Sequence, residues 1–553
     1  MTAEQDLAAG ILDALLRENF GNLADLVQRP SPADPGGPFL HLPGHPPLPL
    51  EPDGFLTDLK LQRPADLTLA DVDAALQKLA DPADEDGVRA FAEECRQALA
   101  TRQLRDREAR PPSRRPAHWL GAGGQLAYDT LAARQPHPAY PTAAARLDFT
   151  DADALAYAPE HRPAFALHWV AVPREKLTRA GTLPPWWPRP SDVGLPPALD
   201  GEHDLLPVHP LTARRALAPA LADLGLPAAR LTAPGTHLKV TPTLSTRTVA
   251  VQREPALHLK LPLPTSTLGR LNRRSIVPGT LADGALVQSV VAAAAVPRLL
   301  LADESHYAHA GHPFLGYLLR RFPDDLDRCR IVPLAALLAP APGPAPALVI
   351  EDLAHMHGDG TLIGLFRDYL FLLFGVAVHL FVRYGIALES HQQNAALVIG
   401  PDEDAPLRLL VKDLGGALLH HDRLTRALPG APPATAFADP RLLTGSDDAL
   451  ADVFTTITLH LGAGALAFGL AAQGRAPLPD LLDLIRAALT QALARYPGHP
   501  AAAVLRARVL DADRLPGKAM LTAGTLQTKA RSGARDINKF YGTTGPNYLK
   551  GRP

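Results

Sequence analysis

The spacing of hydrophobic positions predicts helices in the first part of the chain. In residues 6–28 and 67–108 apolar side chains recur every three or four positions, as Leu7 and Ile11 do. The stretch from Pro30 to Pro52 lies between these regions and is too rich in proline for regular structure. We therefore expect a mainly helical N-terminal region with one long loop.

From about Ala164, short apolar runs separated by Pro and Gly replace the helical pattern, which predicts strands mixed with helices. An Ala-Pro segment, residues 339–346, has the composition of a surface linker and leads into a last, mainly helical region. The predicted fold class is α+β, with domains at 1–160, 161–345 and 346–553. The expected strands of the middle domain are residues 165–172, 236–242, 247–252 and 257–263.

The last region contains an apolar helix, a polar loop and a hairpin in direct succession. Leu365 to Tyr384 form one apolar run of helical length, and the polar loop 389–394 follows. Two strand-like runs, 395–399 and 407–411, are joined by the turn-forming sequence Gly-Pro-Asp-Glu-Asp. The second run leads directly into Lys-Asp-Leu-Gly-Gly.

Asn394 and Asp413 would therefore lie at the ends of paired strands. There an amide oxygen and a carboxylate can converge on one Mg²⁺ ion and its phosphates, with Glu389 as a neighbouring candidate ligand. Protein kinases use the same physical logic, because an Asn and an Asp before a Gly hold their metal. The alternative is a plain hairpin with solvated polar ends.

The apolar run Leu365–Tyr384 is about long enough to cross a bilayer. Arg367, Asp368, His379 and Arg383 interrupt it, and charges at such depth are costly. We expect a buried core helix instead.

Composition excludes several classes of partner. The 55 basic and 57 acidic residues give a net charge of −2 and form no basic stripe for nucleic acid or membrane surface. Cys95 and Cys329 are far apart, which argues against a disulfide framework or a structural zinc site and fits a reducing compartment. The acidic N-terminus lacks the basic start of a signal peptide, so we expect a cytoplasmic protein.

Two segments before the linker, 243–248 and 260–270, combine basic side chains with hydroxyl groups. Arg forks match phosphate oxygens, and Lys adds a point charge, so the combination suits a polyanion. The alternative is that the hydroxyls cap turns and the Arg side chains are solvated. The candidate residues are Ser245, Thr246, Arg247, Lys260, Ser266, Thr267 and Arg270.

Common fingerprints of other sites are absent from the sequence. It contains no Gly-x-x-x-x-Gly-Lys-Ser/Thr loop and no Gly-x-Gly-x-x-Gly after a strand, so an ATP site must be of another type. It also lacks Gly-x-Ser-x-Gly and His-Glu-x-x-His, which argues against a serine hydrolase or a zinc peptidase. Two His-Pro segments, around His137 and His209, can present an imidazole rigidly in a cleft.

Taken in order, these segments resemble the NRPS-independent siderophore (NIS) synthetases, the aerobactin synthetase-like (IucA/IucC) family. The matching segments are residues 11–18, the two His-Pro segments, 157–160, 245–248, 260–270, 389–394, 412–416 and Lys518. The resemblance covers most of the chain, and the order is as informative as the motifs.

The resemblance implies a cupped hand of thumb, fingers and palm, often dimeric. It implies an ATP- and Mg²⁺-dependent ligase that adenylates citrate, a citrate derivative or a succinyl-type acid and passes the acyl group to an amine or hydroxyl. The two basic segments match the family's triphosphate positions. His391, Gln393, Asn394 and Asp413 match its nucleotide and metal loop. The implied catalytic residues are Arg247, Lys260, Arg270 and His391, and the implied carboxylate-substrate residues are His137, Tyr140, Arg146 and His209.

The chain departs from the family pattern mainly around the acyl substrate. Tyr140 stands for the second His of the first motif, Ala144 for its Lys and Asp148 for its Gly, while Lys412 replaces the Arg before the metal Asp. The residues that match the family's nucleotide site follow the family pattern more closely than those that match its acyl-substrate site. A kinase-like phosphotransferase and a degenerate nucleotide-binding protein of the same fold remain as alternatives, because Asn394 and Asp413 would serve either reaction.

Overall fold

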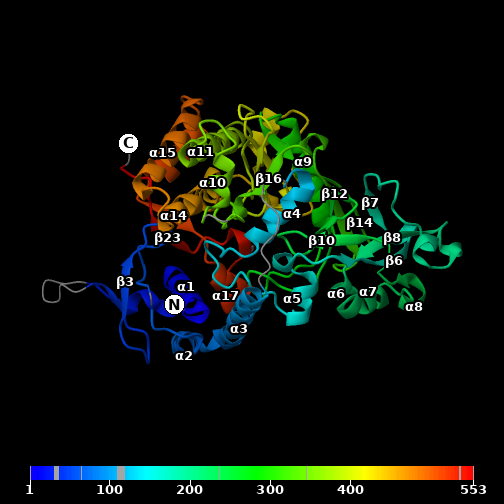
Figure 1. Cartoon of the computed structure of the whole chain (residues 1–553), viewed down its shortest axis with the longest axis horizontal. Coiled ribbons are helices and arrows are strands. Elements are labelled where there is room, and N and C mark those ends of the chain that lie inside the picture. Colours follow the sequence, from blue (N-terminus) through cyan, green and yellow to red (C-terminus); the bar gives the residue numbers. More distant parts are fainter. Residues whose placement is uncertain are drawn as a thin grey trace.

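The computed structural model describes residues 2–29, 37–63, 65–108, 119–235, 237–343, 346–534 and 537–551. Buried hydrophobic side chains form three large clusters, which correspond to three lobes. In Figure 1 the N-terminal helices (blue) lie at the lower left, the sheet-rich middle (cyan to green) extends to the right, and the helical lobe (yellow-green to orange) lies above. The predicted domain limits at residues 160 and 345 stay a prediction.

The N-terminal lobe packs three helices against a four-stranded meander. Thr2 and Thr68 begin the first two helices with capping boxes, in which the side chain of the cap and that of the third helical residue bond each other's backbone. Leu521 and Leu526 from the C-terminal segment join this core. The elements are α1 (Ala3–Arg17), α2 (Leu69–Leu79), α3 (Glu85–Arg107), β1 (Val27–Gln28), β2 (Phe39–Leu40), β3 (Leu48–Pro52) and β4 (Leu59–Leu61).

The Pro-rich stretch is more regular than predicted. β2 and β3 pair within it, with Phe39 opposite Pro49 and Leu40 opposite Leu48. Proline fits into this strand pair because no hydrogen bond from the Pro49 nitrogen is required at its position. The neighbouring backbone N–H of Leu50 donates to Pro38 O at 2.8 Å. Residues 30–36 of the stretch lie outside the described residues.

The middle lobe is built on a seven-stranded sheet of order β5-β10-β11-β12-β15-β14-β7, with a smaller sheet β8-β6-β9 beside it. Its strands are β5 (Phe165–Ala166), β6 (His168–Pro173), β7 (Thr178–Ala180), β8 (His203–Val208), β9 (Thr232–Ala233), β10 (Lys239–Pro242), β11 (Thr248–Val251), β12 (Glu254–Lys260), β14 (Asp303–His309) and β15 (Gly316–Arg321). Its helices are α5 (Asp151–Tyr157), α6 (Pro210–Arg215), α7 (Leu217–Asp223) and α8 (Ala228–Leu231). The mixed α+β class is confirmed.

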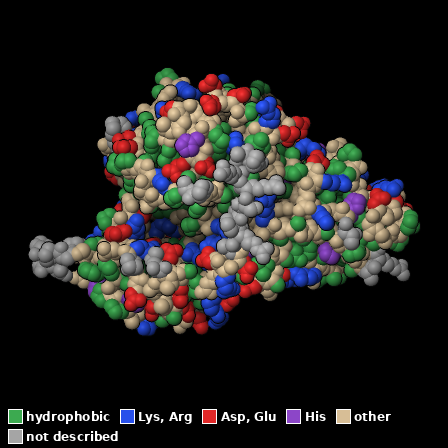
Figure 2. Space-filling view, viewed as in Figure 1, with side chains coloured by type: hydrophobic (Ala, Val, Ile, Leu, Met, Phe, Trp, Pro, Cys, Tyr) green, Lys and Arg blue, Asp and Glu red, His purple; other side chains and the backbone are tan. Residues whose placement is uncertain are grey.

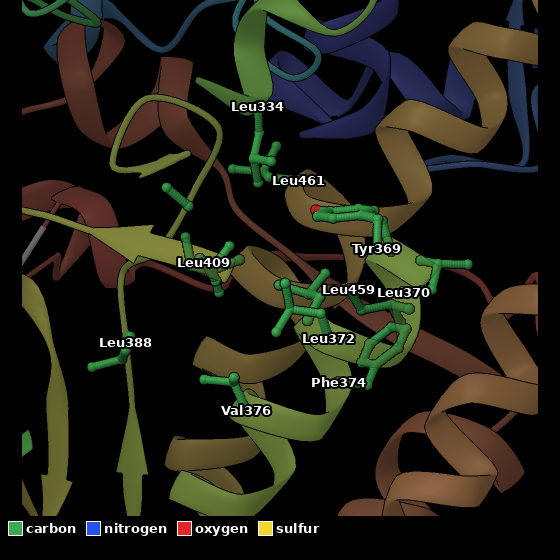
Figure 3. Close-up of a cluster of buried hydrophobic side chains, with 14 of the residues drawn as sticks. Leu334, Tyr369, Leu370, Leu372, Phe374, Val376, Leu388, Leu409, Leu459 and Leu461 are labelled. Carbon is green, nitrogen blue, oxygen red and sulfur yellow. The ribbon is translucent and has the colours of Figure 1, made fainter. Parts of the chain in front are cut away.

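The helical lobe surrounds the sheet β13-β19-β18-β16 and carries two smaller sheets. Tyr369 and Phe374 of α11 pack with Leu459 and Leu461 in its core (Figure 3). The helices are α4 (Gly121–Ala132), α9 (Gly279–Ala293), α10 (Val349–Ala354), α11 (Leu362–His379), α12 (His421–Ala427), α13 (Asp447–Val453), α14 (Ala465–Ala472), α15 (Leu478–Ala494), α16 (Pro500–Arg506) and α17 (Lys529–Ser532). The strands are β13 (Leu299–Leu301), β16 (Arg330–Pro333), β17 (Ile386–Ala387), β18 (Ala395–Ile399), β19 (Arg408–Val411), β20 (Leu418–His420), β21 (Leu443–Thr444), β22 (Arg514–Gly517) and β23 (Thr543–Pro546).

The predicted hairpin is present. β18 and β19 pair in antiparallel register, with Ala395 opposite Val411. The helix before it is also confirmed, as α11 continues in a π-helical turn to Tyr384. Two helical stretches, Leu362–Tyr384 and Asp447–Ala472, are long and apolar enough to cross a membrane, but 67% and 89% of their most apolar windows are buried inside the protein, as in core helices.

The Ala-Pro segment is less linker-like than predicted at its start. Ala339 is completely buried in the core of the helical lobe, and Pro340 forms a bridge with Leu348. Small apolar residues pack in the core at this point. The Ala-Pro composition of the segment therefore did not distinguish a surface linker from a turn in the core. Residues 344 and 345 lie outside the described part of the chain.

The C-terminal segment returns between the lobes, where Figure 1 shows α17 (red) close to the blue helices. A Cβ added at Gly269 would lie 2.7 Å from Gly524 Cα, so the two glycines allow the backbones to touch. Leu271 N–H donates to Gly524 O at 2.9 Å. The 260–270 segment is thereby fixed against the end of the chain.

Candidate active site

Lys260 and Asp413 form an ion pair where the middle and helical lobes meet. Lys260 ends β12, Asp413 follows β19, and Nζ lies 2.6 Å from Oδ1. Burial raises the pKa of the Asp413 carboxyl, but the charges of Lys260 and Arg320 outweigh burial and hold that pKa well below its usual range. Burial lowers the pKa of Lys260, and Asp413 partly offsets this effect. The Asp413 carboxyl is therefore ionised at neutral pH.

Strand topology brings Asp413 next to Glu304. β13 and β19 run parallel, so the residues that follow both strands meet at the same edge. Asp413 has left-handed backbone angles (φ 60°, ψ 57°), and its N–H donates to Glu304 Oε1 at 3.0 Å. Glu304 also pairs with Arg320, and both side chains are buried. An unfavourable backbone held by a buried ion pair is typical of a functional position.

The hairpin ends bring Asn394 beside Asp413, as predicted. Lys412 N–H donates to Asn394 O at 3.0 Å, and Asn394 Nδ2 donates to Glu389 O at 3.2 Å. A Cβ on Gly416 would lie 2.2 Å from Glu389 Oε2, so this carboxylate packs on the Gly-Gly turn. In the described part of the chain no three His, Cys, Asp or Glu side chains cluster as metal ligands.

This donor set fits magnesium better than it fits a metal ion that is coordinated by protein side chains alone. Asp413 supplies a carboxylate and Asn394 an amide oxygen, which are hard oxygen ligands. Mg²⁺ usually takes one or two carboxylates and completes its shell with water and phosphate oxygens.

Two arginines lie close together next to this pair. Arg247 Nη1 donates to Ser275 O at 2.7 Å and to Arg274 O at 3.2 Å. Burial and the charge of Arg247 lower the pKa of Arg274 to about 9, although the Asp413 carboxylate opposes them. Arg274 is not among the residues predicted from the sequence. Its signal was present, because Arg273-Arg274-Ser275 continues the basic, hydroxyl-rich segment.

The other triphosphate candidates occupy different positions. Thr246 has a φ of 63° and its hydroxyl accepts from Arg146 Nε at 3.2 Å. Thr267 O accepts from Arg274 Nη2 at 3.0 Å, and Ser266 Oγ donates to Arg270 O at 2.9 Å. The Arg270 side chain is exposed. Ser245 Oγ accepts from Thr248 Oγ1 at 3.2 Å.

His391 lies close to His137 and Lys518. Burial and the charge of Lys518 together lower the pKa of His391 to about 3. The same two causes lower the pKa of His137 to about 4. Both imidazoles are therefore neutral at pH 7. Gln393 Nε2 donates to Leu244 O at 3.1 Å, which ties this loop to the 243–248 segment.

The remaining acyl-substrate candidates are held by partners of their own. Tyr140 is completely buried and donates to Glu94 Oε1 at 2.8 Å. Arg146 binds Glu160 through two bonds, at 2.6 and 2.7 Å. His209 is completely buried and caps α6, accepting from Leu211 N–H at 3.1 Å. Of the four candidates, His137 is the one that the structure places beside His391.

Figure 2 shows a hollow between the helical lobe above and the N-terminal lobe at the lower left, with Lys and Arg side chains inside it. Such a hollow concentrates positive potential where an anionic ligand enters.

Comparisons with known proteins agree with this arrangement. The sequence model of the IucA / IucC family matches residues 126–339, and that of the ferric iron reductase FhuF-like transporter family matches residues 365–536.

Aerobactin synthase of Escherichia coli is 30% identical over 308 residues, 47% of this chain and 50% of that protein. The uncharacterized protein y4xN of Sinorhizobium fredii is 26% identical over 349 residues, 53% of this chain and 54% of that protein. The chain spans about half the length of the curated relatives it matches.

Solved structures match over nearly the whole chain. Aerobactin synthetase IucC of Klebsiella pneumoniae has a TM-score of 0.72 at 20% identity and covers 99% of this chain and 98% of its own. ATP-bound aerobactin synthetase IucA of the same species has a TM-score of 0.74 at 16% identity, covering 99% and 100%. The petrobactin biosynthesis protein AsbB of Bacillus anthracis has a TM-score of 0.74 at 15% identity, covering 98% and 95%.

The fold is thus that of the NIS synthetases. Over residues 126–339 the chain is similar to the IucA/IucC family, which agrees with the resemblance seen in the sequence motifs.

Proposed function

We propose that this protein is an ATP-dependent ligase of siderophore biosynthesis that joins a carboxylic acid to an amine or a hydroxyl. The observation that carries the proposal is the Lys260–Asp413 ion pair with Arg247 and Arg274 beside it. Several partly buried cations around one carboxylate suit a nucleoside triphosphate whose metal the carboxylate would hold.

In the first step an oxygen of the acid attacks the α-phosphorus of ATP, and the bond to the β-phosphate breaks. The electron pair of that bond leaves with pyrophosphate, and an acyl-adenylate remains. Arg247, Arg274 and Lys260 neutralise the charge that develops on the leaving group, which is the main way that proteins accelerate such transfers. Mg²⁺ held by Asp413 and Asn394 would act as a Lewis acid on the phosphate oxygens.

In the second step the amine or hydroxyl attacks the acyl carbon and AMP leaves. His391 has a pKa of about 3 and is therefore a weak base at neutral pH. We assign it to binding and orienting the nucleotide through a neutral imidazole. Positioning of the two substrates then supplies most of the rate of this step.

The acid is proposed to bind beside His137 and Lys518, next to His391. A citrate-type or succinyl-type acid would place a second carboxylate near the Lys518 ammonium. Tyr140, Arg146 and His209 stay as proposed contributors. Their present partners within the protein imply that they support the surrounding structure rather than contact the acid.

We place the reaction in the cytoplasm, where ATP is available and where the free thiols of Cys95 and Cys329 remain reduced. A homodimer is part of the proposal, on the resemblance to the family alone, and light scattering of the purified protein tests it.

Product analysis tests the reaction. Purified protein is incubated with ATP, Mg²⁺, citrate or succinyl-type acids and a panel of polyamines, hydroxamate amines and alcohols. We expect AMP, pyrophosphate and a condensed product by mass spectrometry. ADP instead of AMP would establish the kinase-like alternative, and ATP binding without turnover with any pair would establish a degenerate protein.

A further inference from the structure

The end of α1 connects two segments that come together at the proposed acid site. The helix ends in Arg17, and Glu18 follows it directly. Their side chains are 9% and 0% exposed, and Arg17 Nη2 lies 3.7 Å from Glu18 Oε1. The two charges therefore form a pair in the interior of the protein rather than on its surface.

Glu18 binds the C-terminal segment through two backbone N–H groups. Leu521 N–H donates to Oε1 at 3.0 Å, and Thr522 N–H donates to Oε2 at 2.8 Å. These donors lie at the start of the helical stretch 520–526, where unpaired N–H groups and the helix dipole favour a carboxylate. Lys518 precedes this stretch by two residues, so Glu18 fixes the backbone from which Lys518 extends.

The backbone before and beside Lys518 is fixed as well. β22 ends at Gly517, directly before Lys518, and the buried His460 of the helical lobe places Nε2 3.1 Å from Pro516 O of that strand. Ala519 N–H donates to Phe540 O at 3.2 Å. Lys518 thus lies in a two-residue connection that is held at one end by the helical lobe and at the other by Glu18.

Arg17 supports the segment that carries His137. Its Nη2 donates to Ala139 O at 2.8 Å, and the N–H groups of Ala139 and Tyr140 both donate to His137 Nδ1 at 3.1 Å. An Nδ1 atom that accepts hydrogen bonds carries no proton, so the neutral imidazole has its proton on Nε2. Arg17 therefore holds the turn that orients the His137 ring and leaves its Nε2–H as a donor.

Stability alone is a poor explanation for such a pair. Apolar residues of similar volume often pack as stably as a buried ion pair, because both charges must be taken out of water. Burial raises the pKa of the Glu18 carboxyl, and the charge of Arg17 and the two backbone N–H donors oppose that effect. What the pair adds is geometry, since one fork and one carboxylate bind backbone groups of two different segments.

We propose that Arg17 and Glu18 are positioning residues that set the spacing between His137 and Lys518. This inference rests on the proposed function, in which the acid binds beside these two groups. An acid with two carboxylates would meet an N–H donor and an ammonium at a separation that the buried pair keeps constant. The pair then acts on the affinity for the acid and on its preferred length, without contacting the acid itself.

Steady-state kinetics of the full-length protein with citrate, succinate and glutarate test the proposal. Glu18→Gln removes the charge and one acceptor oxygen, and Arg17→Gln removes the guanidinium that binds Ala139 O. Asp13→Asn is the matched control on the same helix. Asp13 accepts Leu61 N–H at 2.7 Å and pairs with Arg63 at 2.6 Å, so its partners come from β4 and the residues after it instead of from either segment.

The KM for the acid that wild type uses best should rise roughly 10- to 100-fold in Glu18→Gln and in Arg17→Gln, because a misplacement of about 1 Å can cost roughly 100-fold. The KM for ATP in all three variants, and the KM for the acid in Asp13→Asn, should stay within about twofold of wild type. Deuterium exchange of residues 518–527, followed by mass spectrometry, should be faster in Glu18→Gln than in wild type and Asp13→Asn. Urea melts confirm that each variant folds.

Turnover by wild type together with an unchanged acid KM in the folded variants would overturn this inference and leave the proposed function standing. An equal rise of the acid KM in Asp13→Asn would overturn it too, since the effect would then follow from stability alone. Absence of acid-dependent turnover by wild type would overturn the proposed function and the acid role together. If Glu18→Gln does not fold, Arg17→Gln decides the question.

Discussion

Glu304 accepts the backbone N–H of Asp413 through the same oxygen, Oε1, that pairs with Arg320. The buried ion pair therefore acts on the metal-binding candidate through its backbone rather than its side chain. It holds Asp413 in the left-handed conformation that aims the carboxylate at Lys260.

We expect Glu304→Gln to destabilise the protein and to lower kcat, because the buried Arg320 would lose the carboxylate to which it is hydrogen-bonded. Loss of one partner of a buried pair costs about 3–5 kcal/mol. The measurements are a urea melt and steady-state pyrophosphate release. Glu254→Gln is the control, since Glu254 pairs with the neighbouring Arg321 at the surface and should cost less than about 1 kcal/mol. Equal effects of the two substitutions would contradict the positioning role.

Asp413→Asn should abolish turnover while the protein stays folded. Asn tolerates left-handed backbone angles better than most residues, so this change removes the charge and spares the loop. Asp413→Ala should abolish turnover as well and should also strain the backbone. The readout is AMP formation beside a thermal melt, with Asp404→Asn in the exposed hairpin turn as the control. Near wild-type AMP formation by folded Asp413→Asn would falsify the metal assignment.

The hairpin around these residues could be predicted from the sequence, because strand length, turn residues and the polar ends are all local features. Arg274, Glu304 and Arg320 could not be assigned in the same way. Glu304 comes next to Asp413 through the parallel pairing of β13 with β19, which joins residues more than 100 positions apart. Arg320 on β15 bonds Glu304, and Arg274 lies against Arg247. Arg270 illustrates the limit, because it is exposed while Arg274, four positions further along the same loop, is partly buried, and no periodicity in the sequence distinguishes the two positions.

Arg247 and Arg274 should act on one ligand. Each Arg→Ala change should lower kcat/KM for ATP by roughly 30- to 1000-fold, about 2–4 kcal/mol, and Arg→Lys should rescue it only partly. In the double variant the loss of transition-state stabilisation should be smaller than the sum of the two single losses, since both side chains bind the same triphosphate. Arg270→Ala, the change suggested by sequence alone, is the comparison and should have a smaller effect. A larger loss for Arg270→Ala than for Arg274→Ala would restore the original assignment.

Stability should fall as the pH drops from about 7 toward 4. His391 and His209 have folded pKa values of about 3, below the unfolded value of 6.5, so the unfolded chain binds more protons in this window. The buried carboxyl of Glu94, whose pKa burial raises, acts in the opposite direction. Thermal melts between pH 7.5 and 4.5 should therefore show a shallower pH dependence for His391→Gln and for His209→Gln than for wild type. Parallel curves for all three proteins would contradict the buried, neutral imidazoles.

Tyr140→Phe separates a structural role of this hydroxyl from a substrate role. Glu94 is buried and accepts from Tyr140, Thr142 and Thr525, so it joins α3, the first His-Pro segment and the C-terminal segment.

Loss of one of these charge-assisted bonds should destabilise the protein by about 1–3 kcal/mol. The KM for the acid should change little, because the hydroxyl points at Glu94. Thr142→Val removes a second donor from the same Glu94 oxygen and should give a similar loss of stability, measured by urea melts. A rise in the KM for the acid in Tyr140→Phe alone, without a change in stability, would instead place Tyr140 on the substrate.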